Sequence, residues 1–193
     1  MLHRLIKIGF TLIAIYVSQS ATIADETDSR SILFLGDSLT AGLGIAPDQA
    51  FPALVAQKII EQELPFKVIP SGVSGETSAG GLRRIDWMLR KPVSILVLAL
   101  GANDGLRGID LSDTEQNLQK IIEKTKAKNP EVKVLLAGML MPPNLGPEYT
   151  TQFKEMYPKI ANNNGATLIP FLLEDVAGEK RLNLPDGIHP NPA

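Results

Sequence analysis

The sequence predicts a single α/β domain built on a five-stranded parallel sheet with helices on both faces. Short apolar runs alternate with segments whose apolar residues recur at helical spacing. The chain has 193 residues, of which 44% are hydrophobic and 21% are charged, as is ordinary for one globular domain. No repeat, low-complexity tract or linker divides residues 25–193, so we expect one domain with right-handed crossovers.

Five apolar runs are the candidate strands. The run Ser94–Leu100 (SILVLAL) is continuous, which is typical of a parallel strand buried on both faces. The other four are shorter and fall at residues 32–35, 67–69, 132–137 and 167–169.

Four segments between these runs are predicted to be helices. Residues 51–63 tolerate Pro52 in the first turn, and Leu82, Ile85 and Leu89 share one face of the next helix. Ser112 and Glu115 have capping-box spacing, which predicts that a third helix begins there. A fourth follows, which Pro158 should kink. The inward-facing residues expected in the last two are Leu118, Ile121, Ile122, Tyr149, Phe153, Met156, Tyr157 and Ile160.

The N-terminus has the pattern of a secretory signal peptide, residues 1–24. Arg4 and Lys7 precede an apolar run at residues 8–17 that is too short to span a bilayer comfortably. Small residues follow and predict cleavage after Ser20 or Ala24. We therefore expect a periplasmic or secreted protein without stable membrane insertion after cleavage; an uncleaved anchor is the alternative.

Charge and cysteine content exclude several classes of function. The formal net charge is −2, and removal of Arg4 and Lys7 with the signal would make it two units more negative. No basic stripe is evident, so nucleic acid is not an expected partner, and an acidic surface weakly disfavours anionic membranes. The chain has no cysteine, which excludes disulfides, thiolate metal sites and a cysteine nucleophile.

A serine follows the first predicted strand, in the loop Gly36–Thr40. Such a strand-to-helix turn can expose Ser38 as a nucleophile, whereas the simpler interpretation makes Asp37 or Ser38 a helix cap. Ligands bind at the carboxyl ends of the strands in parallel sheets, and Ser38 lies at such an end.

The second histidine of the chain lies after the fifth predicted strand. His3 falls in the signal segment, so any mechanism that needs imidazole must use His189. Asp186 precedes it by three residues and could fix its tautomer and stabilise the imidazolium. A surface histidine without a role is the alternative.

Two further loops at the same edge carry candidate hydrogen-bond donors. Asn103, in the loop Gly101–Gly105, could donate its amide to an oxyanion. Gly75, in the loop Ser71–Thr77, could bring its backbone N–H close to a ligand. Both loops could equally be ordinary turns, with Thr77 or Ser78 capping the helix that follows.

These blocks resemble the SGNH, or GDSL-type, hydrolases. GDS matches Gly36–Ser38, GxND matches Gly101–Asp104 and DxxH matches Asp186–His189. The stretches GDSLTAGLG, SGVSGETS, GANDGLRG and DGIHPN are similar to the thioesterase I, lysophospholipase and arylesterase branch. The resemblance implies a three-layer α/β/α, flavodoxin-like fold, no metal or other cofactor, and catalytic Ser38, Asp186 and His189. It also implies an oxyanion hole from Ser38, Gly75 and Asn103.

One feature departs from the family. Its members continue past the HPN segment into a final helix, whereas this sequence ends at Ala193, four residues after His189. We expect the domain at residues 25–193 to lack that C-terminal helix and to be aggregation-prone or poorly active for that reason.

The expected function is hydrolysis of a small-molecule acyl ester or thioester by a monomer, through an acyl-enzyme on Ser38. A carbohydrate O-acetylesterase of the same family and a non-catalytic secreted binding module are the alternatives. A metal-dependent phosphoesterase using Asp37, Asp104 and Asp186 is a further hypothesis.

Overall fold

The computed structural model describes residues 30–193, so the expected signal segment and its cleavage sites lie outside the described residues. Five strands form one parallel sheet in the order β2-β1-β3-β4-β5, which confirms the predicted five-stranded parallel sheet. Their bounds are β1 Arg30–Gly36, β2 Phe66–Gly72, β3 Ile95–Ala99, β4 Lys133–Ala137 and β5 Thr167–Ile169.

The strand order reverses at β1. The chain passes from β1 to β2 on one side and then returns to place β3 on the other side of β1. In open parallel sheets, ligands bind beyond the carboxyl ends of the strands at such a switch point. The segments that follow β1 and β3 carry Ser38 and Asn103, so both flank this position.

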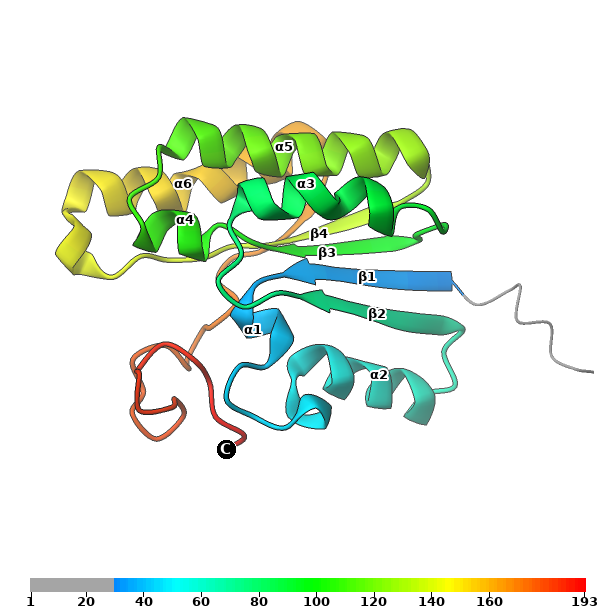
Figure 1. Ribbon diagram of the computed structural model, residues 1–193, viewed down its shortest axis with the longest axis horizontal. Helices are drawn as coiled ribbons and strands as arrows, with labels where there is room; N and C mark the ends of the chain where they lie inside the picture. Colours follow the sequence, from blue (N-terminus) through cyan, green and yellow to red (C-terminus); the bar gives the residue numbers. More distant parts are fainter. Residues whose placement is uncertain (1–29) are drawn as a thin grey trace, which may run out of the picture.

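The helices form layers on the two faces of the sheet (Figure 1). Helices α3, α5 and α6 cover one face, while α2 lies against the other beside β1 and β2. Two short helices, α1 and α4, follow β1 and β3 directly. The bounds are α1 Ser38–Ala41, α2 Phe51–Glu61, α3 Ser78–Met88, α4 Ala102–Leu106, α5 Leu111–Lys128 and α6 Pro147–Asn164. Short 3-10 helices span Pro47–Gln49 and Pro143–Leu145.

Each face of the sheet buries its own apolar cluster. Successive side chains of a strand point to opposite faces, so Leu33 and Leu35 of β1 join the cluster under α3, α5 and α6. Ile32 and Phe34 join Ile59 of α2 on the other face. Seven of the eight helix residues expected to face inward are buried; Tyr149 is only half-buried.

Three local predictions differ from the structure. The third long helix begins at Leu111, because the Asp110 carboxylate accepts the Ser112 N–H at 2.8 Å and caps the helix ahead of the expected position. Helix α6 continues through Pro158, which lies on the exposed side where its missing N–H is least costly. Strand β2 extends to Gly72 through Pro70, which an edge strand tolerates.

In residues 30–193, every helix is too short or too polar to cross a bilayer.

Candidate active site

Ser38 is the first residue of α1, immediately after the turn that leaves β1. Gly36 allows this turn, because a Cβ there would lie 2.9 Å from the Ala99 carbonyl oxygen and closer still to Thr40. The Asp37 carboxylate accepts the Leu39 N–H at 3.0 Å and caps α1, as the simpler interpretation expected. With Asp37 as the cap, the Ser38 hydroxyl is available to another partner.

That partner is His189, which lies 151 residues further along the chain. The Nε2 of its ring lies 2.8 Å from Ser38 Oγ. On the other side of the ring, Nδ1 lies 2.8 Å from Asp186 Oδ2. The structure thus brings Ser38, His189 and Asp186 together in a continuous hydrogen-bonded chain. Ser38 is 9% exposed, so little of it is open to solvent.

Backbone hydrogen bonds keep Asp186 ionised. Its Oδ1 accepts the N–H groups of His189 at 3.0 Å and Ile188 at 2.9 Å. These bonds, followed by the bond to the His189 ring, lower the pKa of Asp186 to about 2. A carboxylate with this pKa stays negative at neutral pH and can stabilise a positive charge on the imidazole.

The segment that carries His189 has no helix or strand of its own, so its turns must fix the ring. The Leu184 N–H donates to the His189 carbonyl at 2.7 Å, and Asn183 pairs with Pro190 in an isolated bridge. The buried Asn183 amide donates to the carbonyls of Val176 and Glu179. These bonds close the turn on itself and position His189.

Gly75 lies in the loop after β2, with a φ of +77° that favours glycine. The loop is tied to β1 because the Val73 N–H donates to the Gly36 carbonyl at 3.0 Å. On its other side, the Arg107 guanidinium donates to the Gly75 carbonyl at 2.8 Å. Thr77 then caps α3, as one of the two predicted caps. The Gly75 peptide is therefore held from two neighbouring segments.

Asn103 lies in α4, where the sequence predicted a loop. Its Nδ2 donates to Asp37 Oδ2 at 3.3 Å, which places the amide beside the residue that precedes Ser38. An amide nitrogen has two N–H groups, so one remains for a ligand. Ser38, Gly75 and Asn103 therefore follow β1, β2 and β3, and Asp186 and His189 both follow β5.

Asp37 is a buried carboxylate, 1% exposed, at the centre of these contacts. Burial raises its pKa from 3.8 to about 6, while the Leu39 N–H, the charge of His189 and the Asn103 amide oppose the increase. Because the folded pKa exceeds the unfolded value, the folded state binds the proton more tightly. The protonated Asp37 carboxyl therefore contributes fully to stability below about pH 4, and this contribution is lost as the pH rises through about 6.

Replacing Asp37 with asparagine should therefore change the pH dependence of stability. We expect the melting temperature of Asp37→Asn minus that of wild type to increase as the pH rises from 4 to 7.5. The reason is that wild type must bury a charge at the higher pH and the variant has none. Two pKa units correspond to about 3 kcal/mol, which is the upper limit of the effect. Thermal unfolding at several pH values measures it. A difference that stays constant over this range would contradict the buried charge as its cause.

Asp104 has a structural position instead of a place beside Ser38. It is fully buried and accepts hydrogen bonds from the N–H and hydroxyl of Ser78 and from the Thr114 hydroxyl. Asp104 therefore joins the start of α3 to α4 and α5. Within the described residues, no group of three His, Cys, Asp or Glu side chains is arranged to hold a metal, so Asp37, Asp104 and Asp186 do not form the hypothesised ligand set.

Two arginines near the site had no role in the sequence interpretation. Arg107 belongs to the stretch GANDGLRG and holds Gly75. Arg84 pairs with Glu76 and donates to the Ser71 carbonyl at 2.6 Å, which fixes the far end of the same loop. Arg107 lies in a motif stretch quoted from the sequence, but no sequence spacing predicts its contact with Gly75, 32 residues away.

A small cavity opens beside the Ser38–His189 pair. Its volume is about 170 Å³. The apolar residues that line it are Leu39, Leu43, Ile45, Phe51, Leu54 and Pro190. An alkyl or aryl group bound there would lie next to the serine hydroxyl.

Comparison with known proteins gives a consistent result. Residues 34–193 match the GDSL-like Lipase/Acylhydrolase family. Esterase TesA of Pseudomonas aeruginosa is 37% identical over 170 residues, which cover 87% of this chain and 83% of that protein. The thioesterase 1/protease 1/lysophospholipase L1 of Escherichia coli K12 is 39% identical over 162 residues, 83% of this chain and 76% of that protein.

A solved structure has the same fold. The crystal structure of AlinE4, described as an SGNH-hydrolase family esterase, superposes with a TM-score of 0.77 at 38% identity. The match covers 84% of this chain and 87% of that one.

Proposed function

The chain belongs to the GDSL-like lipase/acylhydrolase family of ester-bond hydrolases, and we propose that Ser38 is its nucleophile, with His189 as the base and Asp186 as the residue that orients it. The observation that carries this proposal is the hydrogen-bonded chain from Ser38 Oγ through the His189 ring to Asp186, with 2.8 Å at each step. A serine hydroxyl is a weak nucleophile until a neighbouring base accepts its proton.

The reaction then proceeds in two halves. Ser38 Oγ attacks the acyl carbonyl while its proton passes to His189 Nε2, and the ionised Asp186 stabilises the imidazolium. Collapse of the tetrahedral intermediate breaks the ester or thioester bond, and the imidazolium gives its proton to the leaving oxygen or sulfur. Water attacks the acyl-enzyme with His189 as base again, which releases the acid and restores Ser38.

The negative oxygen of the tetrahedral intermediate needs donors that are already in place. We assign this role to the N–H groups of Ser38 and Gly75 and to the side-chain amide of Asn103. Arg107 supports the proposal because it fixes the Gly75 peptide, and Asp37 supports it because it fixes the Asn103 amide. Donors that need no reorganisation during the reaction are worth most in catalysis.

Asn103 offers a direct test of this oxyanion site. An interaction made only in the tetrahedral state lowers kcat and leaves KM little changed. Asn103→Ala should therefore slow turnover by about 10²–10³. Asn103→Asp should be at least as damaging, because it places an acceptor against the oxyanion and a second carboxylate beside Asp37. Steady-state kinetics on a p-nitrophenyl ester measures both, and near-normal turnover of Asn103→Asp would remove Asn103 from the site.

Small acyl esters and thioesters are the substrates that we propose. The apolar cavity beside Ser38 supports an acyl or aryl group. Hydrolysis of p-nitrophenyl esters and acyl-CoA of increasing chain length tests the function, with each rate measured with and without EDTA and an organophosphate. We expect the organophosphate to abolish activity and EDTA to leave it unchanged. Loss with EDTA alone would favour metal-dependent chemistry, and no hydrolysis at all would favour a binding module.

We also propose that the protein acts as a monomer in the periplasm or outside the cell. Arg4, Lys7 and the apolar run at residues 8–17 support export. Cell fractionation and light scattering test the two statements separately.

A further inference from the structure

The outer side of α3 carries an exposed tryptophan among basic residues, a feature that the net charge of the sequence did not suggest. Arg83 and Trp87 lie four residues apart on the exposed side of α3, and Arg90 and Lys91 follow in the next turn. Trp87 is 65% exposed. These four residues are called the α3 face below.

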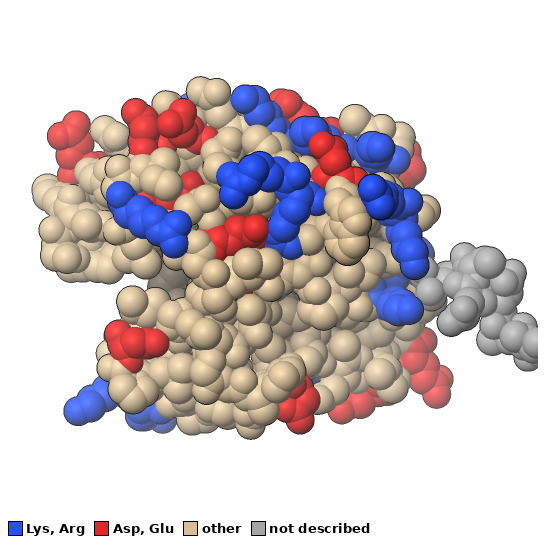
Figure 2. All heavy atoms as spheres, in the orientation of Figure 1, with Lys and Arg blue, Asp and Glu red and all other residues tan. Residues whose placement is uncertain are grey.

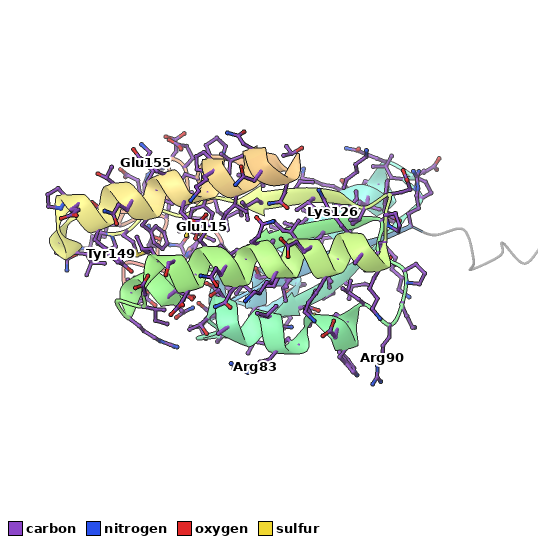
Figure 3. All side chains as sticks on the ribbon, turned by 90° about the horizontal axis from the view of Figure 1, so that it is seen from above. Arg83, Arg90, Glu115, Lys126, Tyr149 and Glu155 are labelled. Carbon is purple, nitrogen blue, oxygen red and sulfur yellow. The ribbon has the colours of Figure 1, made fainter. Side chains whose placement is uncertain are left out.

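The basic residues of the α3 face all lie within residues 83–91. In Figure 3, Arg83 and Arg90 point away from the sheet on the same side of the molecule. Asp86 is the acidic residue within this stretch, and Lys124 of α5 pairs with it at 2.7 Å. The α3 face is therefore positive although the formal net charge of the chain is −2. This local charge differs from the acidic average of the chain, which by itself weakly disfavours anionic membranes.

The α3 face and the candidate active site share one side of the molecule. Figure 2 shows blue side chains along the region of α3, and the same side is hollowed between α4 and the segment that carries His189. Helix α3 begins at Ser78, near the site, and ends toward the opposite edge of the sheet, where Arg90 and Lys91 precede β3.

We propose that the α3 face is a peripheral docking surface for an anionic lipid bilayer. Basic side chains near such a surface are attracted by its negative potential, by about fivefold in affinity for each residue. Tryptophan prefers the bilayer interface, where its ring is in an apolar environment and its N–H stays near water. A soluble polyanion could bind the basic residues but would offer no apolar environment to the Trp87 ring. The combination of basic residues and an exposed tryptophan therefore favours lipid.

The chain contains one tryptophan, so its fluorescence reports on this face alone. The protein without the expected signal segment, residues 25–193, is titrated with vesicles of phosphatidylcholine, with and without phosphatidylglycerol, at low and high salt. With anionic vesicles we expect the Trp87 emission to move to shorter wavelength and to be quenched by spin-labelled lipid. Pure phosphatidylcholine or high salt should abolish the change, because ions screen the attraction.

Matched variants connect the signal to the proposed residues. Arg83→Gln with Arg90→Gln should raise the lipid concentration for half-maximal change by about 25-fold, at about fivefold for each basic residue. Lys58→Gln with Lys154→Gln removes two exposed basic residues from α2 and α6 and should change it by less than about twofold if the effect is local. Co-sedimentation with the vesicles measures binding of Trp87→Ala, which should be weaker than that of wild type. Ile60→Ala is the control, since it alters an apolar residue of α2 that is 76% exposed, and its binding should not change.

Hydrolysis of a soluble ester should stay unchanged in all these variants, which separates this proposal from the catalytic one. Absence of lipid quenching of Trp87, equal response to neutral vesicles, or equal loss in the two charge variants would overturn it. Binding of dextran sulfate without any response to anionic vesicles would assign the α3 face to soluble polyanions instead.

Discussion

Replacing Ser38 with alanine should reduce ester hydrolysis by a factor on the order of 10⁴ or more. The variant loses the atom that attacks the acyl carbonyl, and the remaining donors can only bind the substrate. The Ser38 hydroxyl has one interaction in the described residues, with His189, so its loss should leave the melting temperature nearly unchanged. Initial rates with p-nitrophenyl butyrate and thermal unfolding measure the two effects.

Thr40 provides a matched control for this variant. Its hydroxyl is buried two residues away in the same helix, and no hydrogen-bond partner for it is found among the described residues. Thr40→Val removes that hydroxyl with little change in shape and should retain activity. A folded Ser38→Ala protein with more than about a tenth of wild-type turnover would contradict the role of Ser38.

Replacing His189 with alanine should cause a loss of similar size, because a nucleophile and its base act as one unit. The double variant with Ser38→Ala should be little worse than either single one for the same reason. Imidazole added to the buffer should restore part of the activity of His189→Ala, since the variant leaves an opening beside Ser38 Oγ. Rates measured over a series of imidazole concentrations test this.

Ser38→Ala serves as the control for that rescue, since imidazole cannot replace a nucleophile. Wild type should lose activity on acidification, because a protonated ring cannot accept the serine proton, and His189→Ala should lack that dependence. Full activity of His189→Ala without imidazole would remove His189 from the mechanism.

Much of the fold was predictable because the apolar pattern is strong. The run at residues 94–100 became the central strand β3, and the helix faces around Leu118 and Ile160 are buried as expected. The ends of elements were less predictable, because caps and strand edges depend on neighbours. Asp110 caps α5 although Ser112 has the better motif, and β2 includes Pro70 because no strand pairs beyond it.

The candidate site was predictable from short motifs, but its support was not. Ser38 and His189 were singled out because each follows a strand, and parallel strands bring their carboxyl ends to one edge. The bonds from Arg107 to Gly75 and from Asn103 to Asp37 join segments 32 and 66 residues apart. Their pairing depends on loop conformations, for which the sequence has no periodic signal.

The account depends most on Ser38 as the reacting group, and a covalent adduct tests it most directly. Diethyl p-nitrophenyl phosphate transfers its phosphoryl group to an activated serine and releases p-nitrophenolate. After inactivation, mass spectrometry of the digested protein should find one diethylphosphoryl group, on the peptide that contains Ser38. Ser38→Ala should acquire none, and His189→Ala should react far more slowly. An adduct on Ser71, Ser74 or Ser78 that accompanies inactivation would contradict the proposed nucleophile.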